Sequence, residues 1–215
     1  VFDDALKSGE FQLWYQPKVD PVTANILGAE ALIRWKRPDG TMLSPGKFIP
    51  LFEKNGNIIT LDEYVFRTVC AQQQRWLQAG ATLYPISVNI SRVSLYYNNV
   101  VDKYREILNS FQLDPKYVPL EITESATINN SDIDTIKLDK SLIDYIGDRN
   151  GEKLLLHITQ LLQSFGMTIT AEGVETSDQV EFLKNLHCDD IQGYYFSKPL
   201  PVNEFEDFVR KHTGL

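Results

Sequence analysis

The sequence contains little cysteine and little histidine. Its two cysteines, Cys70 and Cys188, lie far apart and outside any CxxC or Cys/His grouping, which argues against a disulfide framework and a structural zinc site. The three histidines show no HExxH spacing. A metal ion in this chain would therefore have oxygen ligands, which favours Mg²⁺ or Mn²⁺ over zinc. The cysteine usage also indicates a reducing, cytoplasmic location.

Long apolar runs and an excess of positive charge are also missing. There is no run of about 18 apolar residues, and the first residues, VFDDALKSGE, lack the layout of a secretory signal. We therefore expect a soluble domain without membrane contact. The 21 Lys and Arg against 29 Asp and Glu give a net charge of −8, the wrong sign for binding a nucleic-acid polymer. A small anionic ligand is compatible with this charge, because a metal ion held by carboxylates inverts the local field.

The remaining composition is that of a globular domain. The chain has 215 residues, of which 43% are apolar and 23% charged, a size and mixture that suit one large domain. The sequence begins at Val1 rather than at a methionine. We interpret residues 1–215 as a single domain of a longer multidomain protein.

Short apolar runs alternate with segments of helical period, which predicts repeated βα units and a mainly parallel sheet. Polar residues at several strand ends favour a (β/α)₈ (TIM) barrel, whose active site lies at the carboxyl ends of its strands. A doubly wound open sheet is the alternative, disfavoured because no GxGxxG or GxxxxGK[ST] loop follows a strand. We predict strands at 11–19, 27–35, 84–91, 118–125, 134–140, 167–174 and 190–197, and helices at 44–55, 59–79, 100–111, 152–165, 177–186 and 203–211.

The barrel pattern is interrupted between Glu124 and Lys137. Only 13 positions separate these residues, whereas a βα unit of a typical barrel takes roughly 31 residues. One βα unit is therefore missing here. A barrel without an internal strand would expose two unpaired parallel edges, so we favour a segment left out of the sequence over a true deletion.

Charged and amide side chains recur near the predicted strand ends. Glu30 and Arg34 share one face of their strand because side chains alternate along it; a buried ion pair between them is the alternative interpretation. Carboxylates plus an amide oxygen suit Mg²⁺ or Mn²⁺ at a barrel mouth. Other strand ends repeat the pattern with Asn89, Glu121, Glu124, Lys137 and Asp139.

Seven sequence blocks resemble those of EAL domains, the cyclic-di-GMP phosphodiesterases, in the same order. The signature itself is Glu30-Ala31-Leu32 followed by Arg34. The other blocks are YQPKVD (15–20), SVNIS (87–91), LEITES (120–125), DTIKLDKSLI (134–143), AEGVET (171–176) and QGYYFSKPLP (192–201). The resemblance covers nearly the whole chain and implies a modified TIM barrel that opens cyclic-di-GMP to linear pGpG with two divalent cations, in a protein that forms homodimers and carries an upstream sensory or regulatory domain.

The resemblance also implies roles for individual residues. Glu30, Asn89 and Glu121 match metal ligands, and Lys137 and Glu172 match the groups around the attacking water. Gln16 and Arg34 match positions that hold the dinucleotide, and Gln192 matches a polar residue that lines the site. Glu124 matches the anchor of the loop that follows the family's paired aspartates. The alternative role of Lys137 is a structural ion pair with Asp139 or Glu172.

One family feature is absent. The DDFG block, whose adjacent aspartates bridge the two cations, should lie between Glu124 and Lys137, but no Asp-Asp pair occurs there. A complete chain without this block would be a catalytically inactive cyclic-di-GMP receptor or a remnant that does not bind the nucleotide, whereas a protein that contains the block would be an active enzyme. A third interpretation makes Lys137 a Schiff-base nucleophile in an aldolase-like barrel.

Overall fold

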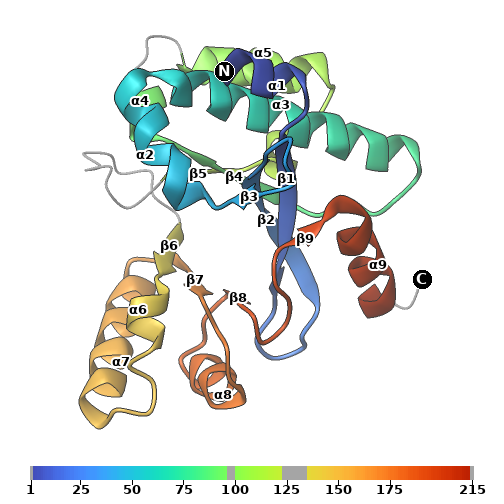
Figure 1. Ribbon diagram of the computed structural model, residues 1–215. Helices are drawn as coiled ribbons and strands as arrows, with labels where there is room; N and C mark the ends of the chain where they lie inside the picture. Colours follow the sequence, from blue (N-terminus) through green and yellow to red (C-terminus); the bar gives the residue numbers. More distant parts are fainter. Residues whose placement is uncertain (1, 96–99, 123–134, 214–215) are drawn as a thin grey trace. The chain divides into compact units, whose positions relative to one another are not determined.

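The computed structural model describes residues 2–95, 100–122 and 135–213 (Figure 1). The chain divides into two compact units. Unit 1 comprises Val1–Tyr15 and Ala29–Thr127, and unit 2 comprises Gln16–Gly28 and Ile128–Leu215. Strands β1 (Phe11–Val19) and β2 (Ile26–Lys36) cross the boundary between the units, so each unit is considered by itself below.

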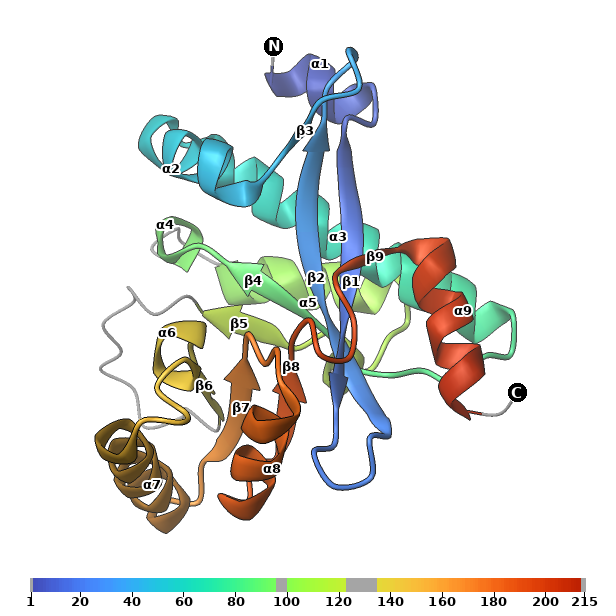
Figure 2. The same ribbon diagram turned by 60° about the horizontal axis from the view of Figure 1, so that its bottom comes forward.

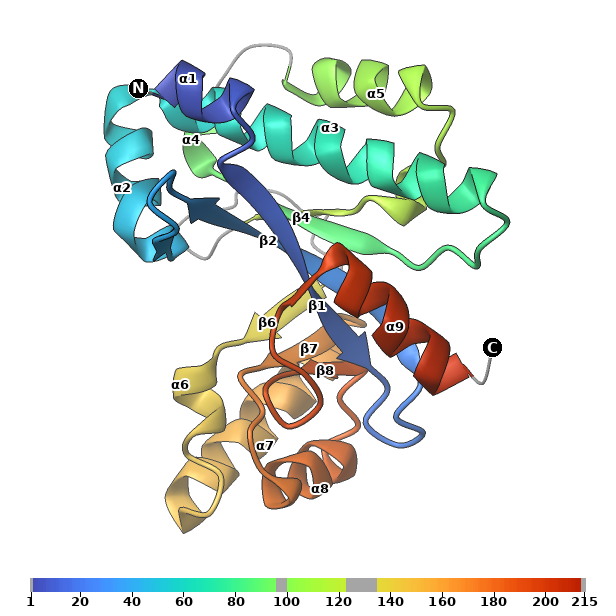
Figure 3. The same cartoon turned by 45° about the vertical axis from the view of Figure 1, so that its right-hand side comes forward.

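Unit 1 contains a parallel sheet with helices beside it. β2 pairs in parallel with β4, β4 pairs in parallel with β5, and β3 adds to β2 in the antiparallel direction. Helix α3 packs against β4 and α5, and the two helices run along one side of the sheet (Figure 3). Apart from β1 and β2, the elements of unit 1 are α1 (Phe2–Lys7), β3 (Met42–Leu43), α2 (Pro45–Asn55), α3 (Asn57–Gln78), β4 (Ile86–Ile90), α4 (Arg92–Leu95), α5 (Val100–Ser110), a 3₁₀ turn (Pro115–Tyr117) and β5 (Leu120–Ile122).

Unit 2 repeats the strand-helix order. β6, β7 and β8 pair in parallel, and β8 meets the end of β1 in the antiparallel direction at Val19 and Ile191 (Figure 2). Its core is formed by buried aliphatic side chains from strands and helices, including Leu138, Leu155 and Ile169. The elements are β6 (Thr135–Leu138), α6 (Lys140–Ile143), α7 (Arg149–Ser164), β7 (Thr168–Glu172), α8 (Ser177–Asn185), β8 (Asp190–Gln192), β9 (Leu200–Pro201) and α9 (Val202–Thr213).

Local signals in the sequence explain where the helices begin and end. Thr176 and Gln179 form a reciprocal capping box at the start of α8, which satisfies main-chain N–H groups that have no partner inside the helix. Gly166 follows α7 with φ +71°, a left-handed conformation that glycine adopts without steric cost. None of the helices in the described ranges is long and apolar enough to cross a membrane.

The predicted elements are found, with corrected boundaries. All six predicted helices form, and the seven predicted strands correspond to β1, β2, β4, β5, β6, β7 and β8. The strand predicted at 190–197 was too long, because β8 ends at Gln192. After it the chain turns, and the N–H of Tyr195 donates to the oxygen of Val174 at 3.0 Å. Residues 123–125, predicted to extend β5, lie outside the described residues.

Candidate functional site

Three predicted site residues of unit 1 lie on one face of three neighbouring strands. Glu30 on β2 pairs in register with Ser87 on β4, and Asn89 lies two residues further along β4. Asn89 pairs with Glu121 on β5. Side chains two residues apart share a face, and so do registered neighbours in a parallel ladder. We call Glu30, Asn89 and Glu121 the acidic triad.

Glu30 is buried and makes a short contact within this triad. Its side chain is 5% exposed, and Asn89 Nδ2 donates to Glu30 Oε1 at 2.5 Å. Because the amide nitrogen of Asn89 is turned toward Glu30, its oxygen is the atom left to act as a metal ligand. Two carboxylates and one amide oxygen fit a hard divalent cation, whose remaining positions take water or substrate oxygens.

Arg34 lies on the same strand face as Glu30 but also contacts an aromatic ring. Its guanidinium carbon is 5.6 Å from the centroid of Trp14, and Nη1 donates to the main-chain oxygen of Ile33 at 2.9 Å. A guanidinium over an indole ring is held by cation–π attraction, and guanidinium groups are also common partners of phosphates. This arrangement is compatible with the predicted dinucleotide contact.

Unit 2 contains a second triad with the same stagger. Lys137 on β6 pairs in register with Thr170 on β7, and Glu172 lies two residues beyond Thr170. Glu172 pairs with Gln192 on β8. By the same alternation, Lys137, Glu172 and Gln192 share one face of the sheet. We call them the mixed triad, because it contains a cation, an anion and an amide.

The two charged members of the mixed triad form an ion pair. Lys137 Nζ lies 2.6 Å from Glu172 Oε1, and the two side chains are 22% and 26% exposed. Asp139 has a different role, because its carboxylate accepts the N–H of Ser141 at 2.8 Å at the start of α6. Bonds from Ser141 lower the pKa of Asp139. The contact with Glu172 corresponds to the alternative role of Lys137, that of a structural ion pair.

Gln16 and Gln192 meet within unit 2, although they are far apart in the sequence. Gln192 Nε2 donates to Gln16 Oε1 at 3.3 Å, and Gln16 Nε2 donates to the oxygen of Ser197 at 3.2 Å. Gln16 is 7% exposed and Gln192 is 4% exposed. The resemblance placed both at the dinucleotide site, and the structure brings them into contact.

The structure describes all but one of the predicted site residues. Glu124, the predicted loop anchor, lies outside the described residues. The acidic triad lies in unit 1 and the mixed triad in unit 2. Among the residues that the structure describes, no three or more His, Cys, Asp or Glu side chains are grouped closely enough to hold a metal ion.

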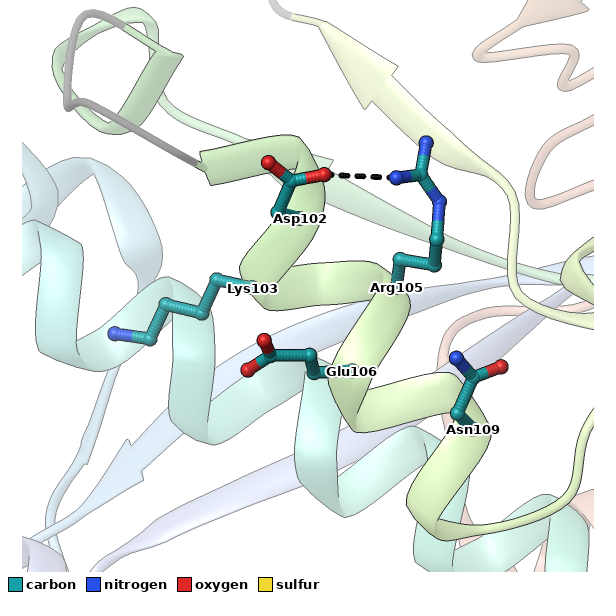
Figure 4. Close-up of a pocket in the computed structure, with 5 residues that line it drawn as sticks. All are labelled: Asp102, Lys103, Arg105, Glu106 and Asn109. Carbon is teal, nitrogen blue, oxygen red and sulfur yellow. Dashed lines mark hydrogen bonds and ion pairs between the residues drawn. The ribbon is translucent and has the colours of Figure 1, made fainter.

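A hollow of about 570 Å³ lies along α5 (Figure 4) and contains none of the predicted site residues. All of its lining side chains come from that one helix. Asp102 pairs with Arg105 at 2.7 Å, and Lys103 pairs with Glu63 of α3 at 2.5 Å. These contacts are ion pairs at the protein surface, which contribute little to stability.

A smaller cavity of about 150 Å³ in unit 1 does reach the acidic triad. Asn89 lines it together with Glu53, Asp62 and Ser91, among apolar side chains of α2, α3 and β2. The sequence analysis did not single out Asp62 or Glu53. The available signal was a carboxylate on the apolar face of a helix, since Asp62 is four residues after Ile58 and four before Phe66, which are both buried.

Parallel strands with polar side chains near their carboxyl ends, and helices between them, define an α/β protein of TIM-barrel type. A family model described as the EAL domain matches residues 2–132 and 126–199, and the chain belongs to the EAL domain family. The predicted family and the predicted fold class are therefore confirmed.

Curated relatives and solved structures agree with this assignment. The bifunctional diguanylate cyclase/cyclic di-GMP phosphodiesterase MucR of Pseudomonas aeruginosa is 30% identical over 236 residues, covering 93% of this chain and 34% of the relative. The cyclic di-GMP phosphodiesterase NbdA of the same organism is 30% identical over 244 residues, covering 97% of this chain and 31% of the relative. The chain thus spans about a third of the length of these relatives.

A solved structure of the MucR phosphodiesterase in complex with c-di-GMP superposes with a TM-score of 0.87 at 30% identity, covering 94% of this chain and 97% of that one. The EAL domain of Xanthomonas citri FimX, at 20% identity and a TM-score of 0.80, covers 93% of this chain and 92% of its own, and it supports the fold alone.

The alignments also bear on the missing βα unit. The MucR alignment extends over 236 residues, but 93% of this 215-residue chain is only about 200 residues, so about 36 aligned positions have no residue here. The two family-model matches overlap at residues 126–132, within the stretch from Glu124 to Lys137. Both findings agree with a chain that is about one βα unit shorter than the aligned region of its relatives.

Proposed function

We propose that this chain is a metal-dependent phosphodiesterase that hydrolyses cyclic-di-GMP to linear pGpG. The observation that carries the proposal is the pair of triads, in which three neighbouring parallel strands of each unit present the predicted residues on one face. The names of MucR and NbdA support the substrate class. The solved MucR complex supports a dinucleotide ligand for this fold.

In this proposal the acidic triad holds the divalent cation, Mg²⁺ or Mn²⁺. Glu30 and Glu121 supply carboxylate oxygens, and Asn89 supplies its amide oxygen while its nitrogen stays bonded to Glu30. A second cation would rely on the paired aspartates that are absent between Glu124 and Lys137. A divalent cation supplies Lewis acidity that stabilises the charge growing on the phosphoryl oxygens.

The mixed triad handles the proton and the positive charge. Glu172 accepts a proton from water as the water oxygen bonds to phosphorus, and the bond from phosphorus to the 3′ oxygen breaks. Lys137, held 2.6 Å from Glu172, donates to the phosphate or to the departing oxygen. Gln16 and Gln192 line the dinucleotide site through their mutual contact, and Arg34 binds a phosphate. The product retains the cleaved phosphate on the 5′ oxygen.

A second candidate function is binding of cyclic-di-GMP without hydrolysis. Two observations favour it: the absence of an Asp-Asp pair between Glu124 and Lys137, and the roughly 36 aligned positions that the chain lacks. Without bridging carboxylates, the cation site carries less negative charge, so a second divalent ion would bind more weakly. Such a chain would act as a receptor.

Formation of pGpG separates the two functions. Purified protein of verified intact mass is incubated with cyclic-di-GMP in Mg²⁺ or Mn²⁺, and the products are separated by chromatography. We expect pGpG to form when metal is present. No pGpG should form when EDTA is included from the start. Binding of cyclic-di-GMP without pGpG, in protein of the stated sequence, would reject the enzyme and support the receptor.

We further propose that residues 1–215 form one EAL domain of a longer cytoplasmic signalling protein and that this domain forms homodimers. The threefold greater length of the curated relatives supports additional domains. Exposed apolar side chains at α7 support the dimer, because Leu154 and Leu161 of this helix and Phe165 at its C-terminal cap are 47%, 56% and 68% exposed. Sedimentation at several protein concentrations measures the oligomeric state.

A further inference from the structure

The turn after β4 is held by two carboxylates from two different helices of unit 1. The main-chain N–H of Ser91 donates to Asp62 Oδ2 at 2.9 Å, and the hydroxyl of Ser91 donates to Glu53 Oε1 at 2.9 Å. The same hydroxyl oxygen accepts the N–H of Val93 at 3.1 Å. Ser91 is therefore fixed through its main chain, through its hydroxyl proton and through its hydroxyl oxygen.

Asp62 is an unusual residue for its location. It is 7% exposed on a helix whose buried residues are mostly apolar, and Oδ2 also accepts the hydroxyl of Ser94 at 2.6 Å. Burial raises the pKa of Asp62 to about 6 despite these bonds. A buried carboxylate is costly compared with an apolar residue of similar volume, so an aspartate here contributes more to a defined geometry than to stability.

The residue held by Asp62 and Glu53 lies two positions beyond Asn89. The cavity of about 150 Å³ is lined by Asn89, Ser91, Asp62 and Glu53 together, so the carboxylates and the triad border the same space. Asn89 itself makes a short contact with Glu30. A shift of the strand end would alter that contact and the direction of the Asn89 oxygen. Small displacements of this kind reduce metal affinity when an outer partner of a ligand is removed.

We propose that Asp62 is a positioning residue that, through Ser91, holds the end of β4 so that Asn89 presents its amide oxygen to a divalent cation. Glu53 assists by holding the hydroxyl of the same serine. This inference rests on the proposed metal site, and it adds an outer layer of residues that the motif resemblance does not assign.

The test measures binding of Mn²⁺ alone by titration calorimetry on the whole chain. The wild type should bind Mn²⁺ with a heat that disappears in Glu30→Ala. Asp62→Ala, which removes the acceptor for the Ser91 N–H, should weaken this binding about tenfold. Asp62→Asn should restore binding to within about twofold of wild type, because its amide oxygen can accept both bonds.

A control variant in the same cluster separates positioning from stability. Ser94→Ala removes the other donor to Asp62 and leaves the Ser91 bond intact. We expect its melting temperature to fall, because a buried charged group loses a hydrogen bond, while its Mn²⁺ affinity stays within about twofold of wild type. Asp102→Ala on α5 serves as an exposed carboxylate control and should leave both quantities unchanged within error.

The inference has several ways to fail. Equal weakening of Mn²⁺ binding in Ser94→Ala and Asp62→Ala would assign Asp62 to fold stability alone. Unchanged Mn²⁺ affinity in Asp62→Ala would also overturn the inference. So would wild-type protein in which Mn²⁺ binding does not depend on Glu30. If Asp62→Ala does not fold, the inference is tested with Glu53→Ala. We expect this variant to bind Mn²⁺ about threefold more weakly than wild type, a small effect because the Ser91 N–H keeps its acceptor. Unchanged Mn²⁺ affinity in Glu53→Ala would overturn the inference. Mn²⁺ binding that follows these predictions in a protein that forms no pGpG would reject the phosphodiesterase and leave the positioning role standing.

Discussion

The acidic triad of unit 1 and the mixed triad of unit 2 use the same arrangement of strands for different chemistry. In both, the first residue is registered with a position two residues before the second, and the second is registered with the third. Unit 1 fills these positions with two carboxylates and an amide, and unit 2 fills them with an ammonium, a carboxylate and an amide.

This difference in charge determines what each triad can bind. The acidic triad consists of two carboxylates and one amide, so it suits a metal ion. The mixed triad is neutral because Lys137 and Glu172 form an ion pair, and it suits proton transfer and contact with a phosphate. The comparison teaches that parallel strand ends fix where side chains lie, while the residue types decide the reaction.

Loss of Glu30 should have the largest effect. Glu30→Ala removes one of the two carboxylates from the acidic triad, so cyclic-di-GMP turnover should fall by at least about 10³-fold, together with Mn²⁺ binding. Initial rates of pGpG formation and calorimetry measure the two effects, and circular dichroism checks the fold, which should stay nearly intact. Wild-type rates in this variant would remove the acidic triad from the mechanism.

Loss of Lys137 should separate the two triads. Lys137→Met removes the cation of the mixed triad, so turnover should fall by about 10²-fold, whereas Mn²⁺ binding at the acidic triad should be unchanged. The matched control is Lys140→Met in the same unit, since Lys140 also pairs with carboxylates, at 2.9 Å from Asp144 and 3.2 Å from Glu175, but is 44% exposed. Lost Mn²⁺ binding in Lys137→Met alone would show that the division of roles is wrong.

A third prediction tests how the mixed triad is supported. A Cβ at Gly193, the residue after Gln192, would lie 2.0 Å from the main-chain oxygen of Val174. Gly193→Ala should therefore lower the free energy of unfolding by about 3 kcal/mol, measured by urea denaturation. Gly46→Ala in unit 1 is the control: its Cβ meets nothing within 4 Å, so a helix-favouring alanine there should be neutral or stabilising. Similar losses in both variants would contradict the close approach of main chains in unit 2.

The same contact explains one limit of the sequence analysis. The run of aromatic residues after Gln192 is typical of a strand, but the main chain of Gly193 packs against Val174 and the strand ends there. The positions of strands and helices along the chain could be predicted because they follow from periodicity, whereas the roles of the triad residues follow from the family resemblance and stay a prediction. This backbone contact depends on tertiary structure, and neither pattern encodes it.

Side-chain partners were harder to predict than positions. The pairing of Lys137 with Glu172 was one of two alternatives, and the structure selects it. The contact of Glu30 with Asn89 was not predicted, because which side chains meet across strands depends on the stagger between them. Asp62 was missed for a similar reason, since its partner Ser91 is 29 residues away in the chain.

The smallest predicted effect concerns pH, and it has opposite signs in the two units. Burial raises the pKa of Asp62 in unit 1 from 3.8 to about 6, whereas bonds from Ser141 lower the pKa of Asp139 in unit 2. Between about pH 4 and 6, folded protein keeps a proton on Asp62 that the unfolded chain has released. Raising the pH through this window should therefore lower the free energy of unfolding, by about 1 kcal/mol per pH unit, and the contribution of Asp62 should be constant below and above it.

Asp139 should behave in the opposite way, because its ionised form is favoured in the folded state. Its stabilising contribution is present above pH 3.8, the ordinary pKa of the group, and is lost as the pH falls through the lower folded value. Urea denaturation of wild type, Asp62→Asn and Asp139→Asn from pH 3 to 7 measures both effects. Subtracting the Asp62→Asn curve from wild type should give a difference that declines between pH 4 and 6. The Asp139→Asn subtraction should give a difference that declines as the pH falls below 3.8. If both differences changed with pH in the same direction, the two carboxylates would not be held in contrasting environments. In the structure, burial dominates at Asp62, whereas hydrogen bonds at the start of a helix dominate at Asp139.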